Sequence, residues 1–237
     1  LLRNMKRKHL TLLLLGFLTG FSATAQTNSV KVAGAMKNVM KKGELQGTIS
    51  LDSVAKRGVY GLGPVEFLSG ELLILDGEVF KSVVRNENSM EVEKTNAVKA
   101  PFFVYAEVEK WKSVSLPNSV NSLENLENFL NERTPDDAEA FPFRLKGKIN
   151  SAKIHIVNLP KGRKVSSPKE AHEGLTTYTL EDKEIEILGF FSRKHQAVFT
   201  HHNTYMHLHL ITEDEKQMGH LDQVEFDANN LKLYLPE

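Results

Sequence analysis

The sequence contains no cysteine, and this absence limits the chemistry that the chain can perform. Disulfide bonds and thiolate-ligated metals are excluded, so any bound metal must rest on His, Asp or Glu side chains. A net charge is also lacking, because 30 basic residues balance 30 acidic ones. That balance argues against a dedicated nucleic-acid-binding protein, which would usually carry a basic excess. The apolar content of 41% is ordinary for a globular protein.

Long apolar runs are missing too, with one exception near the N-terminus. Residues 10–21 are mostly apolar, follow the basic cluster at residues 5–9, and precede the small residues Ala23 and Ala25. This order is typical of a secretory signal peptide over residues 1–25. The run is shorter than the roughly 20 residues that cross a bilayer, although an uncleaved anchor is the alternative. We therefore expect cleavage, export to a periplasm or the medium, and no stable membrane span afterwards.

The patterning of residues 26–237 predicts a β-rich α+β protein with a few helices. Asp76-Gly77 is a strong hairpin signal inside the apolar stretch 68–80, and residues 144–157 alternate as strands do. Helices are expected over residues 30–42 and 123–131, where apolar positions fall on one face. The basic stretch 161–172 reads as an exposed loop. The acidic stretch at residues 135–139 suggests a boundary between domains 26–140 and 141–237.

Histidines are concentrated near the C-terminus, in a segment that alternates like a strand. The chain has nine histidines, and four of them fall between Phe199 and His209. Side chains alternate between the two faces of a strand, so His207 and His209 should share one face while Met206 and Leu208 pack on the other. Two imidazoles on one face can bind the same small ion, at about 2.0–2.1 Å for zinc. Two histidines on a solvated strand face are the alternative.

A third histidine follows after a polar segment that suits a hairpin turn. Residues 212–217 would form the turn, and a return strand would bring His220 opposite the first pair. Gly219 would let the backbone pass close by. Three neutral imidazoles with an open fourth position are typical of a catalytic site for Zn²⁺ or another divalent ion. The other histidines look unrelated to this cluster: a loop is expected for His201 and His202, and the protein surface for His155, His172 and His195.

Further motifs occur in a fixed order along almost the whole mature chain. They are Gly61-Leu62-Gly63, Gly70-Glu71 before an apolar strand that ends in Leu75-Asp76-Gly77, Phe143-Arg144-Leu145-Lys146-Gly147, Leu188-Gly189-Phe190, His207-Leu208-His209 and Gly219-His220. Together they resemble the α-acetolactate decarboxylase family. The chain departs from the family pattern at Pro64, where a threonine is usual, and its segment 199–206 is a few residues longer.

The resemblance implies a two-domain fold, with an N-terminal mixed sheet with helices and a smaller, β-barrel-like C-terminal domain that carries the metal. It implies that His207, His209 and His220 hold zinc, and that Glu71 and Arg144 are active-site residues. It also implies a homodimer and a small keto acid as substrate, 2-acetolactate, which the family converts to acetoin and carbon dioxide. A charged keto acid would need a carboxylate and a guanidinium beside a metal.

Two other functions are compatible with the same residues. His207, His209 and Glu213 partly match the first motif of cupin metalloenzymes, which would make Glu213 a ligand in place of His220. An exported binding protein without catalytic activity could also use this scaffold. Loss of metal on replacing His220 would support the decarboxylase interpretation, and loss on replacing Glu213 would support the cupin interpretation.

Overall fold

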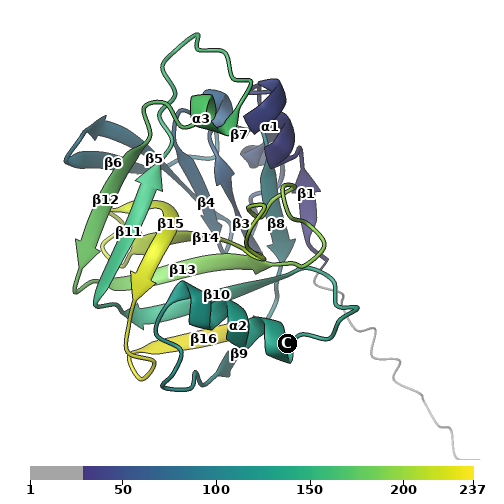
Figure 1. The fold of residues 1–237 in the computed structure, drawn as a ribbon, viewed down its shortest axis with the longest axis vertical. Coiled ribbons are helices and arrows are strands. Elements are labelled where there is room, and N and C mark those ends of the chain that lie inside the picture. Colours follow the sequence, from purple (N-terminus) through teal and green to yellow (C-terminus); the bar gives the residue numbers. More distant parts are fainter. Residues whose placement is uncertain (1–28) are drawn as a thin grey trace, which may run out of the picture.

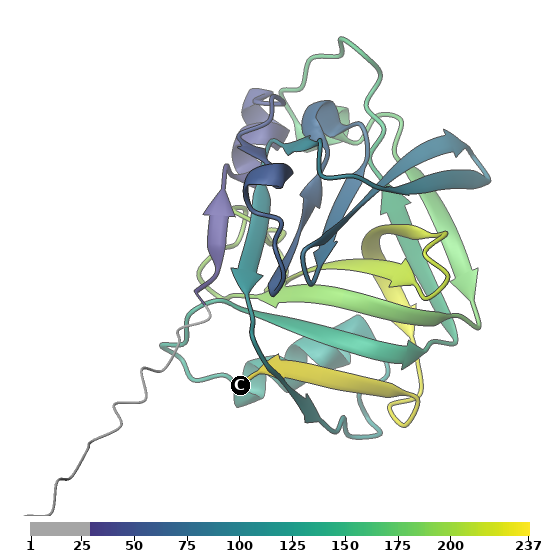
Figure 2. The same cartoon turned by 180° about the vertical axis from the view of Figure 1, so that it is seen from behind.

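A computed structural model describes residues 29–237, so the expected signal peptide at residues 1–25 lies outside the described residues. Within residues 29–237, no helix is long and apolar enough to cross a membrane. Two large sheets make up most of the structure, and their strands run in different directions (Figure 1). The view from behind shows the same two sheets stacked along the long axis (Figure 2).

The first sheet contains strands from the N-terminal half of the chain. Its six strands, in spatial order, are β1 (Lys31–Ala33), β8 (Phe103–Glu107), β3 (Val59–Pro64), β4 (Glu71–Leu75), β5 (Glu78–Asn86) and β6 (Ser89–Lys94). A two-stranded ladder of β2 (Ile49–Ser50) and β7 (Lys99–Ala100) accompanies it. The hairpin expected at Asp76-Gly77 joins β4 to β5, and both residues have positive φ, as such a tight turn requires.

The second sheet is built mainly from the C-terminal half. Its eight strands, in spatial order, are β12 (Thr176–Glu181), β11 (Ser151–Ile156), β15 (Met218–Glu225), β14 (Met206–Thr212), β13 (Glu184–Phe191), β10 (Phe141–Lys148), β16 (Leu231–Pro236) and β9 (Trp111–Val114). The edge strand β9 precedes the expected domain boundary but pairs with β16. The division into domains at residue 140 therefore stays a prediction.

The α-helices among residues 29–237 are α1 (Met36–Lys42), α2 (Leu123–Arg133) and α3 (Pro168–Ala171), and two short 3-10 helices lie at Leu51–Ser53 and Glu66–Leu68. The Ser122 side chain caps α2 by accepting a hydrogen bond from the Asn125 backbone N–H. Helix α1 begins later than predicted, because Gly34 has a φ of 65° and ends β1. The predicted loop at residues 161–172 contains α3, which begins with Pro168 after the capping Ser167.

The hydrophobic core has separate layers on the two faces of the second sheet. On the outer face, Leu126 and Phe129 of α2 pack with sheet residues such as Phe143 and Leu208. On the inner face, the two sheets pack against each other through a buried layer. Its members include Tyr60, Leu62, Leu73 and Phe80 from the first sheet and Leu188, Phe190, Ile211 and Met218 from the second. A polar side chain that points into this buried layer is therefore removed from water.

The β-rich fold with few helices is confirmed, and two details differ from the expectation. The first sheet is not mixed, because every pairing between its described strands is antiparallel. The second sheet is the larger of the two, and it is open rather than closed into a barrel, with β12 and β9 as its edges. Antiparallel sheets of this kind can bury one face against a partner sheet and the other against a helix.

Candidate metal centre

The alternation predicted for the histidine strand is present in β14. Met206, Leu208 and Leu210 point to the outer face and belong to the core beneath α2. His207 and His209 therefore point to the inner face, between the two sheets, where their side chains are buried. Imidazoles at this depth, away from bulk water, need a partner for their ring nitrogens.

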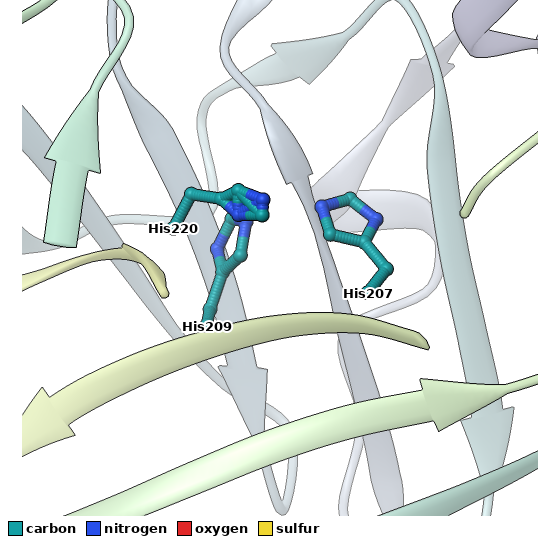
Figure 3. Close-up of side chains that lie close together, drawn as sticks. All are labelled: His207, His209 and His220. Carbon is teal, nitrogen blue, oxygen red and sulfur yellow. The ribbon is translucent and has the colours of Figure 1, made fainter. Parts of the chain in front are cut away.

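The third histidine reaches the same place from the neighbouring strand. A hairpin joins β14 to β15, and their antiparallel register puts His220 directly opposite His209. One ring nitrogen from each of His207, His209 and His220 lies within 4.8 Å of the others. Figure 3 shows the His207 ring facing the rings of the other two across a small gap. The structure thus brings together the three histidines that the sequence pattern selected.

The state of the ring nitrogens suits metal ligation. Among residues 29–237, Nδ1 of His207 and both ring nitrogens of His209 are buried and make no hydrogen bond of good geometry, although the backbones of Phe199 and Leu72 lie near these two rings. Burial lowers the pKa of His209 to about 3 and holds the pKa values of His207 and His220 well below the usual range. The rings are therefore neutral at pH 7, with lone pairs available. Buried nitrogens without partners cost stability, and a divalent ion between them would satisfy them.

Glu71 is the one carboxylate buried beside the three histidines in the described part of the chain. It begins β4, and its Oε2 lies 3.6 Å from Nε2 of His209. Its Oε1 accepts a hydrogen bond of 3.2 Å from the backbone N–H of Val157. Burial raises the pKa of this carboxyl well above its usual range. A nearby cation would favour the charged form, so Glu71 is placed to respond to a metal ion.

Arg144 is not brought into this pocket. The register across the second sheet places Arg144 beside Leu188 of β13, and Leu188 beside His209. Two strand spacings therefore separate Arg144 from His209, which is about 10 Å between backbones. The guanidinium is held elsewhere: its Nε donates to Glu186 at 2.7 Å, and it lies over the ring of Tyr60. Its role in a reaction stays a prediction from the resemblance.

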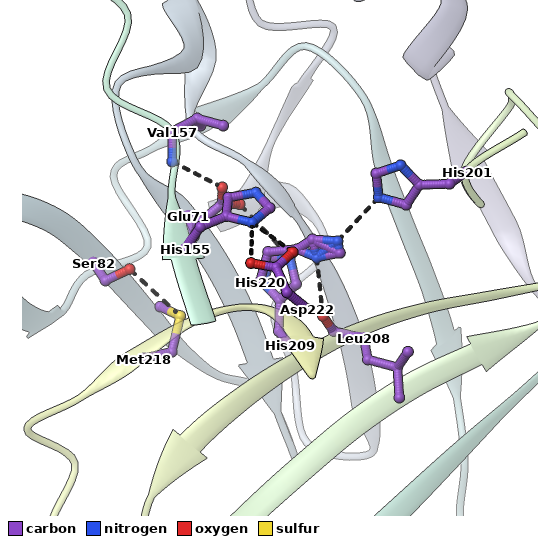
Figure 4. Close-up of polar contacts among 10 residues, drawn as sticks. All are labelled: Glu71, Ser82, His155, Val157, His201, Leu208, His209, Met218, His220 and Asp222. Atoms are coloured by element: carbon purple, nitrogen blue, oxygen red, sulfur yellow. Dashed lines mark hydrogen bonds and ion pairs between the residues drawn. The ribbon is translucent and has the colours of Figure 1, made fainter. Parts of the chain in front are cut away.

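Two histidines that were expected to be unrelated belong to the cluster. His155 lies opposite His220 on β11, is buried, and bonds to Asp222 through Nδ1 at 2.8 Å. The Nε2 atom of His201 lies 3.0 Å from Nε2 of His220 (Figure 4). The surface prediction for His155 is therefore wrong. The sequence shows that His155 lies between Ile154 and Ile156, which are buried in the structure. It does not show that β11 pairs with β15, and this pairing places His155 beside His220.

Two hollows meet at these histidines. The inner one has a volume of about 30 Å³, and Glu71, His207 and His220 are among its lining residues. The outer one measures about 430 Å³ and opens beside Glu127 at the start of α2. His201 and His220 line both hollows, so they form the wall between them. The inner hollow can hold an ion or a water molecule, while a small organic molecule needs the space of the outer one.

A sequence model of the alpha-acetolactate decarboxylase family matches residues 16–235. The chain belongs to this family. An alpha-acetolactate decarboxylase of Brevibacillus brevis is 26% identical over 203 residues, and one of Methanosarcina mazei is 23% identical over 192. These matches cover 83% and 81% of the chain, but only 66% and 64% of the relatives. The chain thus spans slightly less than two thirds of these relatives.

The fold of the family is confirmed by a solved structure. The alpha-acetolactate decarboxylase from Bacillus subtilis strain 168 superposes with a TM-score of 0.71 at 19% sequence identity. The superposition covers 87% of this chain and 84% of that one.

The family match argues against the cupin alternative, and so does the position of Glu213. This residue follows β14 at the exposed hairpin and, within residues 29–237, is not among the groups of side chains that could hold a metal ion.

The backbone at Gly219 is expected to tolerate no side chain. A Cβ atom there would lie 2.6 Å from the carbonyl oxygen of His155 on β11, and backbone cannot move aside easily. Gly219→Ala should therefore force β15 away from β11 and destabilise the fold by about 1–3 kcal/mol. It should also displace His220, the next residue, and so weaken any binding of a metal ion such as zinc by the three histidines. Urea unfolding and zinc titration measure both effects.

Gln223→Ala is the matched control, because this exposed residue lies on the same strand. Its unfolding free energy and zinc affinity should equal those of the unchanged protein. Wild-type values for both quantities in Gly219→Ala would show that the close approach of β15 and β11 is not required.

Proposed function

We propose that this chain is a metal-dependent acetolactate decarboxylase, which converts 2-acetolactate to acetoin and carbon dioxide. The proposed metal is zinc, or another divalent ion, held by His207, His209 and His220. The observation that carries the proposal is the convergence of three buried, neutral imidazoles beside one buried carboxylate. Membership of the family supports the choice of substrate.

The donor set fits a catalytic ion better than a structural one. Three imidazole nitrogens leave at least one coordination position for another ligand, as in other three-histidine zinc enzymes. A divalent ion bound there supplies a Lewis acid that stabilises negative charge developing on the substrate's ketone oxygen. The protein places this charge between two packed sheets, where electrostatic interactions are stronger than in water.

Glu71 is the proposed proton acceptor. The Val157 N–H holds one of its oxygens, which leaves the other directed toward His209 and the inner hollow. In this position the carboxylate can accept a hydrogen bond from the tertiary hydroxyl of 2-acetolactate when that hydroxyl reaches the ion from the outer hollow. It can take up the hydroxyl proton and return a proton to the carbon that loses carbon dioxide, which completes acetoin. Burial alone raises the pKa of Glu71, whereas a divalent ion beside it would favour the charged form, and only the charged carboxylate can take up the proton.

Arg144 is not assigned a direct contact with substrate in this proposal, because Leu188 lies between its strand position and that of His209. Pro64 lies opposite Glu71 in the register of β3 and β4 and also lines the inner hollow. It lacks the hydroxyl of the family's usual threonine. Any polar contact to the substrate carboxylate at this end of the pocket must therefore come from other side chains.

Assay of the purified protein with zinc and 2-acetolactate tests the function. Acetoin should form faster than by spontaneous decarboxylation, and removal of metal with a chelator should return the rate to the background. A background rate with fully metal-loaded protein would reject this substrate. In that case the binding-protein alternative would remain for the same scaffold.

Two further properties belong to the proposal and follow from the sequence. Residues 1–25 would direct export and be cleaved, which mass spectrometry of the secreted protein can test. The family resemblance implies a homodimer, which light scattering of the mature protein can test. A secreted protein that still carries residues 10–25, or a monomer in solution, would reject the respective statement.

A further inference from the structure

The contact between His201 and His220 is the least explained feature of the pocket. Their Nε2 atoms lie 3.0 Å apart, and the two rings are nearly parallel, with an interplanar angle of 13°. His220 directs its other nitrogen, Nδ1, toward the carbonyl oxygen of Leu208 at 3.4 Å. With the Nδ1 proton facing that carbonyl, the lone pair of His220 lies on Nε2 and faces His201.

A bound ion would change the kind of interaction that His201 and His220 can make. Without metal, His201 can donate a hydrogen bond from Nε2–H to the lone pair of His220. Once that lone pair binds a metal, the hydrogen bond cannot persist. Two nitrogen ligands of one ion are about 2.9–3.4 Å apart when each bond is about 2.0–2.1 Å long and the angle between them is 90–109°. The observed separation of 3.0 Å from His220 lies in that range. His201 is not grouped with His207 and His209 by the 4.8 Å spacing that the three strand histidines share, so its ring must turn toward them to complete the set.

The loop that carries His201 is fixed on both sides of it. Before it, the side chains of Phe199 and Thr200 are completely buried. After it, Glu127 of α2 accepts hydrogen bonds from the Thr204 hydroxyl and from the Tyr205 backbone N–H. Only residues 201–203 lie between these anchors. The His201 ring can therefore move only a short distance relative to the three strand histidines.

The environment of His201 also suits a ligand. Its side chain is half-buried, and burial lowers its pKa, so the ring is neutral at pH 7. It does not belong to the strands, unlike the three histidines of the centre. As part of the wall between the two hollows, it lies where a molecule from the outer hollow would approach the centre.

We propose that His201 is a fourth protein ligand of the metal, supplied by the loop between β13 and β14. It completes the coordination of the ion when no substrate is present, and it separates the centre from the outer hollow. Three ligands on strands are held in place by the sheet, whereas a ligand on a loop can give up its position to a substrate oxygen. This inference rests on the metal site of the proposed function.

Cobalt-substituted full-length protein tests the proposal through its visible absorption. His201→Ala should exchange one nitrogen donor for water, which shifts the cobalt d–d bands, and it should weaken zinc binding by at least about tenfold. His201→Gln provides a second variant that preserves more of the side-chain volume. His202→Ala is the matched control, since this neighbouring histidine is exposed, and it should leave both the bands and the affinity unchanged.

The outcomes separate this inference from the proposed function. Cobalt bands in both His201 variants identical to those of the unchanged protein would overturn the fourth-ligand assignment, whatever the zinc affinity. If the bands are unchanged in the His201 variants but His209→Ala binds no metal, the three-histidine site stands although His201 is not a ligand. If His209→Ala still binds metal with unchanged bands, the proposed metal site itself is wrong.

Discussion

Replacing His209 with alanine is expected to abolish stoichiometric binding of the divalent ion and to slow decarboxylation by about 10³-fold or more. His209 is the central ligand, because it shares β14 with His207 and lies opposite His220. Two histidines alone hold a divalent ion weakly, and without the ion no charge stabilises the transition state. A 10³-fold loss corresponds to about 4 kcal/mol of transition-state stabilisation. Metal content by mass spectrometry and initial rates of acetoin formation measure the two effects.

Glu213→Ala is the control for the metal content, because this exposed acidic residue is the ligand that a cupin centre would use. It should bind about one ion per chain, like the unchanged protein. Since His209 is completely buried, His209→Gln should be measured as well, in case the alanine variant does not fold. A folded His209 variant with full zinc content would refute the ligand assignment.

Replacing Glu71 with glutamine is expected to lower turnover by about 10²–10⁴-fold while the zinc content stays unchanged. Glutamine preserves the size of the side chain and can still accept the hydrogen bond from Val157 through its carbonyl oxygen. It cannot take up a proton from the substrate hydroxyl. The expected defect is therefore in the rate constant for turnover, kcat, and not in metal binding.

Glu87→Gln is the matched control, because Glu87 is exposed in the hairpin between β5 and β6. This variant should have the turnover of the unchanged protein. Full turnover in Glu71→Gln would remove Glu71 from the mechanism. Loss of zinc in Glu71→Gln would mean that the carboxylate is a metal ligand and not the proton acceptor.

The core of the candidate site could be predicted from local sequence. Alternation within β14 fixed the faces of His207 and His209, because side chains in a strand alternate with a period of two. The polar segment 212–217 indicated a hairpin, and an antiparallel return placed His220 opposite His209. Each of these steps depends on residues that are near one another in the chain, so a single sequence contained enough information.

The rest of the site depends on pairings between distant segments. His155 joins the cluster only because β11 pairs with β15, and Arg144 is kept apart only because β13 lies between β10 and β14. Glu71 reaches His209 through the packing of one sheet on the other. Local patterning does not specify which strands become neighbours. Glu71 was found through the family resemblance, whereas His155 and His201 had no comparable signal.

Because local patterning does not specify which strands pair, the observed fold also differs from the predicted one. The hairpin of β4 and β5, the strand pattern in residues 144–157 and the hairpin of β14 and β15 followed from alternation and turn residues. The pairing of β9 with β16 in the second sheet had no local signal. Short elements were also missed, since α3 has only four residues and lies in a segment rich in lysine and serine. Its signal was the Ser167 cap followed by Pro168, a combination that begins many helices.

Burying the histidines lowers the stability of the folded protein, and a bound metal ion would offset this loss. Three imidazoles between packed sheets give up hydration, and several of their nitrogens make no hydrogen bond of good geometry in the described residues. A protein without a ligand for these atoms would be more stable with apolar side chains in their place. Their retention at the interface between the sheets is best explained by a bound ion.

Anomalous diffraction from crystals of the zinc-loaded protein, recorded on both sides of the zinc absorption edge, would locate a bound ion relative to the three histidines. We expect one strong peak between the two sheets, about 2.0–2.1 Å from a ring nitrogen of each of His207, His209 and His220. A peak elsewhere, or three rings turned away from one another with no peak between them, would contradict this expectation.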